Sequence, residues 1–95
     1  MQLPARLTMR EARATSAALG TGVAAAPRGS RLAVDAKALH ELDTAALAVL
    51  LQAQRDALAR GVTLVVEGTP PQLRRIAALY GVEALLGLAP PETGG

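Results

Sequence analysis

Three short apolar segments, each followed by a segment with helical periodicity, limit most strongly what this chain can fold into. The apolar segments are residues 2–7, 31–35 and 62–67. Strands that alternate with helices pair in parallel, because the chain must cross over the sheet before the next strand begins. The 95 residues suffice for one domain. The sequence therefore predicts an α/β fold, a mostly parallel sheet with helices packed on it, over residues 1–89, followed by a flexible tail at 90–95.

The apolar segments differ in the kind of strand they predict. Residues 62–67 are rich in β-branched side chains without interruption, which is typical of a central strand. Residues 31–35 are apolar at their centre and favour a buried strand. Pro4 lacks an N–H for the ladder, so residues 2–7 are expected to form an edge strand or an irregular one. A last apolar segment, residues 82–88, fits no single type of element.

Boundary signals define the first helix at its start more clearly than at its end. The helix is expected to begin at Thr8, because Glu11 three residues later completes a capping box. It is expected to run through Leu19. Gly20 and Gly22 weaken the helical pattern beyond that residue.

The second helix has the strongest pattern. Asp43 and Thr44 are both good N-caps, and Gly61 is a typical C-terminal stop. One apolar stripe is expected to face the core. It consists of Ala46, Leu47, Leu50, Leu51, Ala53, Ala57 and Leu58.

The third helix is expected to be capped by Thr69, with Pro70 and Pro71 in its first turn, where proline is tolerated. Gly81 is expected to end it. The apolar face of this helix is expected to consist of Leu73, Ile76, Ala77 and Tyr80.

Charge and aromatic content argue against nucleic-acid binding and membrane insertion. The formal net charge is only +2, the arginines are scattered apart from the adjacent Arg74 and Arg75, and Tyr80 is the one aromatic residue. A nucleic-acid binder usually shows a basic stripe or aromatic side chains for stacking. No apolar run approaches the roughly 18 residues that a membrane span needs. Residues 1–10 do not resemble a secretory signal, so the protein is expected in the cytoplasm.

The sequence offers little for catalysis. It contains no cysteine, which excludes thiolate nucleophiles and thiolate metal ligands. His40 is the only histidine, and although carboxylates lie near it in sequence, a single loop histidine is more often solvated. We therefore expect no enzyme activity, no cofactor and no metal site.

One junction between strand and helix resembles that of a known family. The buried strand ends at Asp35, a short loop follows, and Asp43 and Thr44 open an amphipathic helix. This junction is similar to that of the STAS domain, the fold of bacterial anti-sigma factor antagonists and of the C-terminal domain of sulfate transporters, where an Asp precedes a Ser or Thr. The resemblance covers roughly residues 3–88 and implies the STAS fold.

Within that family the chain is most similar to the MlaB-like branch, because of its short length, its threonine at Thr44 and the helix end at residues 78–81. Members of that branch are small cytoplasmic subunits of the Mla ABC transporter, which moves phospholipid and maintains outer-membrane lipid asymmetry. The resemblance implies that this chain binds the transporter's ATPase, and through it the permease at the inner membrane. The implied contact residues are His40, Asp43, Thr44, Ala45, Leu47 and Thr69.

Three interpretations of Thr44 stay open. Its hydroxyl could cap the helix, contact a partner, or accept a phosphate near the positive end of the helix dipole. Phosphorylation of Thr44 belongs to an alternative function, that of an anti-sigma factor antagonist that binds an anti-sigma factor kinase. A module that senses a small ligand has only the fold in its favour.

Overall fold

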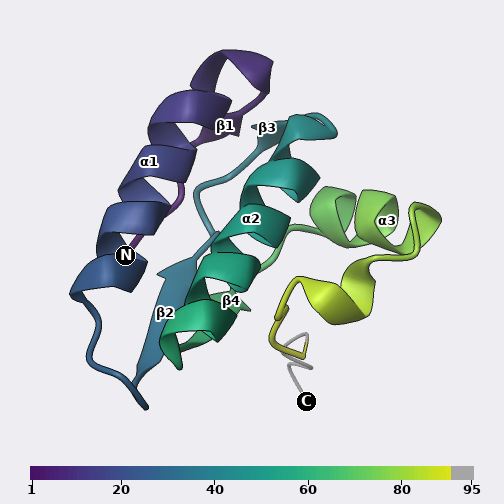
Figure 1. The fold of residues 1–95 in the computed structure, drawn as a ribbon. Coiled ribbons are helices and arrows are strands. Elements are labelled where there is room, and N and C mark those ends of the chain that lie inside the picture. The colour runs from purple at the N-terminus through teal and green to yellow at the C-terminus, as the bar shows by residue number, and fades with distance from the viewer. Residues whose placement is uncertain (91–95) are drawn as a thin grey trace.

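The computed structural model describes residues 1–90 and shows strands alternating with helices (Figure 1). The strands are β1 (Arg6–Leu7), β2 (Arg31–Asp35), β3 (Glu41–Leu42) and β4 (Thr63–Glu67). The helices are α1 (Met9–Ala25), α2 (Ala45–Arg60), α3 (Pro71–Leu79) and a short 3₁₀ helix, η1 (Glu83–Leu85). Of the expected tail at 90–95, Pro90 is exposed and the remainder lies outside the described residues.

The strand pairs are parallel, as the alternation of strands and helices predicts. β2 pairs with β4 in a register that runs from Arg31 opposite Thr63 to Asp35 opposite Glu67. β1 pairs with β3, and single parallel bridges join residue 2 to β2 and residue 88 to β4. The α/β architecture expected from the sequence is confirmed.

Residues 2–7 form the irregular one of the two expected alternatives rather than a continuous edge strand. The first part of this segment lies along the end of β2, where Leu3 N–H donates to Asp35 O at 2.8 Å. Pro4 has no N–H to continue that ladder. The chain then pairs with β3 instead, and Ala5 O accepts the N–H of His40 at 2.9 Å. β3 has two residues, which is too short for a recognisable sequence pattern.

α1 and α2 lie side by side over one face of the β2–β4 pair (Figure 1). Both helices follow parallel strands, so they start at the same end of the molecule. α1 continues through Gly20 and Gly22 to Ala25. The core between these helices and the sheet includes Leu19, Val23, Val34, Leu50 and Val66, all fully buried.

Two residues expected on buried helix faces are exposed. Leu58 is 82% exposed, since it lies about 100° around the helix from Ala57, which marks the edge of the buried stripe of α2. Tyr80 is 58% exposed, because α3 ends at Leu79 and Tyr80 leaves the helical stripe. Both side chains therefore belong to the surface rather than the core.

The segment after η1 covers the outer edge of β4. Val66 N–H donates to Gly87 O, and Ala89 N–H donates to Val66 O, each at 2.8 Å. Gln54 of α2 fills the remaining gap, because its Nε2 donates to both Leu64 O and Leu86 O at 2.9 Å. The edge of β4 that does not pair with β2 is thus satisfied by the backbone of residues 87–89 together with the Gln54 side chain.

We expect Gln54→Glu to lower the free energy of unfolding by about 1–3 kcal/mol, because the new carboxylate faces two carbonyl oxygens and has no N–H to donate to them. Urea unfolding followed by circular dichroism measures the change. Gln72→Glu, at an exposed position of α3, makes the same chemical change without a buried acceptor and serves as the control. Equal stability of the two variants would contradict this assignment of Gln54.

Candidate functional site

Asp43 connects the N-termini of α1 and α2. Its Oδ1 accepts the N–H of Ala45 at 2.8 Å, and its Oδ2 accepts the N–H of Met9 at 3.3 Å. The amides at a helix start lack partners within the helix, and the helix dipole favours a negative charge there. One carboxylate therefore satisfies an amide of each helix and holds the two helix starts together.

Thr44 does not act as a side-chain cap. It has helical backbone angles and no capping hydrogen bond, since Asp43 takes that role. Of the three interpretations of Thr44 that the sequence leaves open, the cap is the one that the geometry removes. Thr44 is exposed and free of that task, directly before α2 and next to the carboxylate that links the helices.

The other residues implied as contacts next to Thr44 divide into surface and core. His40 is exposed, and its Nδ1 lies 3.3 Å from Ala38 O. Ala45 is half-buried. Leu47 is only 6% exposed and packs in the core, because it faces the sheet from the first turn of α2. The expectation that the Leu47 side chain meets a partner is therefore corrected.

The start of α1 lies next to the start of α2 and contributes to the same surface. Thr8 N–H and the Thr8 hydroxyl donate to Glu11 Oε1 at 2.9 and 2.6 Å, and Arg10 N–H donates to the Thr8 hydroxyl at 3.3 Å. The predicted capping box is present. The hydrogen bond from the Thr8 hydroxyl, followed by the one from its amide, lowers the pKa of Glu11 below its ordinary value of 4.5.

A shallow groove of about 420 Å³ runs between α1 and α2 beside this surface. Met9, 80% exposed, lies at the start of α1, and its N–H is the one that Asp43 accepts. The groove is lined by Ala12, Arg13, Ser16, Ala17, Ala48 and Val49. These residues were not predicted as a site, although the small residues Ala12 and Ser16 lie one helical turn apart. We call Met9, His40, Asp43, Thr44 and this groove the helix-start face.

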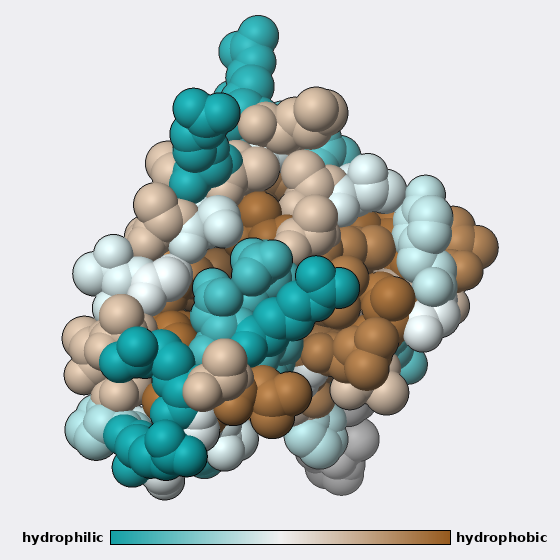
Figure 2. Space-filling model, in the orientation of Figure 1, coloured by the Kyte–Doolittle hydropathy of each residue, from teal (hydrophilic) through white to brown (hydrophobic). Residues whose placement is uncertain are grey.

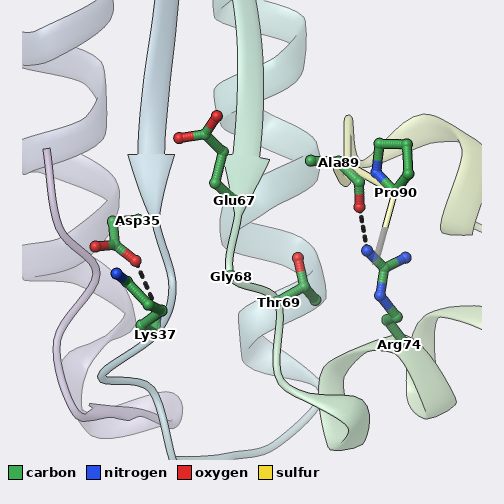
Figure 3. A pocket seen from close by; sticks show the side chains of 8 residues that line it. All are labelled: Asp35, Lys37, Glu67, Gly68, Thr69, Arg74, Ala89 and Pro90. Carbon is green, nitrogen blue, oxygen red and sulfur yellow. Dashed lines mark hydrogen bonds between the residues drawn. The ribbon is translucent and has the colours of Figure 1, made fainter. Parts of the chain in front are cut away.

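Thr69 lies elsewhere, in a crevice at the carboxyl ends of β2 and β4 (Figure 3). None of the other residues implied as contacts lines this crevice. Thr69 does not cap α3, because the N-cap is Pro70 and no side chain caps the helix. The expected cap is wrong, and the structure does not bring Thr69 into the helix-start face.

A third surface feature is apolar. Figure 2 shows hydrophobic side chains gathered on the side of the molecule that α3 and η1 occupy. Leu79, Tyr80 and Leu85 are between 58% and 78% exposed there. The sequence pattern did not reveal this patch, because Tyr80 was expected on the buried face of the helix and residues 82–88 fitted no single type of element.

Within residues 1–90, no group of three or more potential metal ligands comes together, and no helix is long and apolar enough to cross a membrane.

A protein-family model described as the Mlab STAS domain matches residues 1–87. The chain belongs to the MlaB-type STAS domain family. The STAS fold expected from the Asp43-Thr44 junction is therefore confirmed over nearly the whole chain. None of the curated proteins matches it. STAS domains are in general non-catalytic, and membership of this branch suggests an Mla-related role.

We expect Asp43→Ala to lower the free energy of unfolding by about 1–2 kcal/mol, because two helix-start amides lose their acceptor. Thr44→Ala should change it by less than about 0.5 kcal/mol, since the hydroxyl makes no capping bond. Urea unfolding of the two variants measures both changes. A larger loss for Thr44→Ala than for Asp43→Ala would show that Thr44 is the cap after all.

The capping box should make stability depend on pH. The folded pKa of Glu11 is below its unfolded value, so its contribution is present above pH 4.5 and disappears as pH falls through the folded pKa. Wild type should exceed Glu11→Gln in stability at pH 6, and the difference should be smaller at pH 3. Urea midpoints at the two pH values test this. A difference that stays constant would rule out the charge of Glu11 as its source.

Proposed function

We propose that this chain is a non-catalytic STAS subunit that binds and stabilises the ATPase of an ABC-type phospholipid transporter, one that maintains outer-membrane lipid asymmetry. The family match supports a role of this kind. One structural observation indicates where on the chain the partner binds. Asp43 caps α2, and the exposed Thr44 hydroxyl therefore stays available to a partner.

The helix-start face has the features of a protein contact. Met9 offers an exposed flexible apolar side chain. The open groove between α1 and α2 is lined by four small residues together with Arg13 and Val49, and the small residues allow a partner's side chain to approach closely. Thr44, His40 and Asp43 supply polar groups around this apolar part. An apolar centre with a polar rim is the usual anatomy of a specific interface.

Binding at this face acts on the ATPase by mass action. A partner that binds the folded and assembled ATPase, but not its unfolded chain, shifts the equilibrium toward the assembled form. The STAS subunit then meets the permease only through the ATPase, and its action at the helix-start face requires no contact with nucleotide. This places it in the cytoplasm, at the inner membrane, through its partner.

The same hydroxyl supports one alternative function. An anti-sigma factor antagonist would use Thr44 as a phosphate acceptor, and an exposed hydroxyl without a capping bond suits that chemistry as well. Phosphate would add about −1.5 to −2 charge beside the Asp43 carboxylate, and the repulsion would release a bound partner. The two functions differ in the partner, an ABC ATPase or an anti-sigma factor kinase, and not in the residue.

We expect Thr44→Glu to weaken binding to the ABC ATPase of the host at least tenfold, because it places a second carboxylate next to Asp43 within the contact. The domain should stay folded, since Thr44 makes no capping bond. Calorimetric titration of the purified ATPase measures affinity, and circular dichroism checks the fold.

Two variants make this test specific. Thr21→Glu introduces the same charge at an exposed threonine on the last part of α1, away from the helix starts, and should bind like wild type. Leu79→Ser alters the apolar surface of α3 and should also bind normally. If Leu79→Ser loses affinity and Thr44→Glu does not, the ATPase docks on α3 and the helix-start face is not the interface.

A further inference from the structure

The crevice at the carboxyl ends of β2 and β4 is separate from the helix-start face and has the dimensions of a small-molecule site. Its volume is about 590 Å³, within the range of about 300–1,000 Å³ common for ligand pockets. In open parallel sheets, ligands bind outside the carboxyl ends of the strands. The position and the size of the crevice thus agree with a binding site.

Thr69 carries a buried polar atom that lacks a partner. Its Oγ1 is shielded from solvent and makes no hydrogen bond within residues 1–90. In Figure 3 the hydroxyl points from the segment after β4 into the space between Gly68 and Ala89. A buried hydroxyl without a hydrogen-bond partner lowers the stability of the fold. Such a group calls for an explanation, and a bound ligand or solvent molecule that completes its hydrogen bond is one.

The charges of the crevice are arranged in two halves (Figure 3). Asp35 and Glu67, which are register partners across the parallel strands, supply the carboxylates of an acidic half, and Lys37 lines the same side next to Asp35. Arg74 of α3 lies on the opposite side, where a guanidinium nitrogen donates to Ala89 O and fixes the side chain. The Arg74 guanidinium makes no ion pair among the described residues, and Thr69 lies between the two halves.

The acidic half is only partly compensated by neighbouring groups. Asp35 Oδ1 accepts the N–H of Lys37 at 2.8 Å, which leaves its Oδ2 free of protein hydrogen bonds in the described part of the chain. Glu67 Oε2 lies 3.8 Å from Arg31 Nη2. Both side chains are at least half-exposed, so this ion pair contributes little to stability. Gly68, with a φ of 66°, lets the Lys37 stem pass close, since a Cβ there would lie 2.5 Å from Lys37 Cγ.

We propose that this crevice binds a small zwitterion, a molecule with an ammonium group and an acidic group. The ammonium group lies against Asp35 and Glu67. The acidic group receives hydrogen bonds from Arg74 and from the Thr69 hydroxyl, which supplies the missing partner of that buried atom. This site rests on the geometry of the crevice alone and does not depend on the partner at the helix-start face.

The test is isothermal titration calorimetry of the full chain with two zwitterions, O-phosphoethanolamine and β-alanine, at constant ionic strength. At least one of them should bind, and at least tenfold more tightly than inorganic phosphate, acetate or ethanolamine, which each offer half of the ligand. If neither zwitterion binds, or if phosphate alone binds equally well, the proposal is overturned.

Variants assign the binding to the crevice. Thr69→Val should weaken binding about tenfold, because one hydrogen bond to a charged group is lost. Its melting temperature without ligand should be unchanged or higher, since a buried hydroxyl without a partner has been removed. Arg74→Gln should abolish binding, whereas Arg75→Gln, at the exposed neighbouring position, should not alter it. Binding by Thr69→Val and Arg74→Gln equal to wild type would contradict the site.

The zwitterion could be free in solution or the headgroup of a lipid. Sedimentation with vesicles of phosphatidylethanolamine and phosphatidylcholine, compared with phosphatidylcholine alone, distinguishes these sources. Sedimentation that requires phosphatidylethanolamine and is lost in Thr69→Val indicates a headgroup. If the protein does not sediment with phosphatidylethanolamine but binds soluble O-phosphoethanolamine or β-alanine, the ligand is free in solution.

Discussion

The Asp43 carboxylate is the interaction on which the arrangement of the helix-start face depends. One oxygen holds the first turn of α2 and the other reaches the first amide of α1, 34 residues earlier in the chain. Because both helices follow parallel strands, their positive dipole ends meet at one place, and a single negative charge serves both. This geometry explains why Asp43 is needed there and why the hydroxyl of Thr44 stays free of a structural task.

The two candidate sites lie at the carboxyl ends of different pairs of strands. The helix-start face follows β1 and β3, whereas the crevice follows β2 and β4. Thr44 is exposed and suits a protein partner, and the Thr69 hydroxyl is buried and suits a small ligand. A domain of this size can therefore present a docking surface and a ligand crevice, each built from its own loops.

Patterns that act within one element were predictable from the sequence. The capping box at Thr8, the strand at 31–35 and the stop at Gly61 are local, and each is present. Features that depend on tertiary neighbours were not. The cap of α2 falls to Asp43 and not Thr44 because α1 offers a second amide, and β3 exists only because residues 5–7 lie beside it. The residues that line the crevice come from segments 35–37, 67–74 and 89–90, and no spacing in the sequence indicates that these segments lie together.

Binding to the ABC ATPase is best tested by affinity capture of the tagged chain from its native host, followed by mass spectrometry of the proteins that accompany it. We expect an ABC ATPase together with its permease, at constant stoichiometry, and their loss when the bait carries Thr44→Glu. Capture of a kinase-like anti-sigma factor without the ATPase would contradict this expectation, and would move the protein to the regulatory branch of the STAS family.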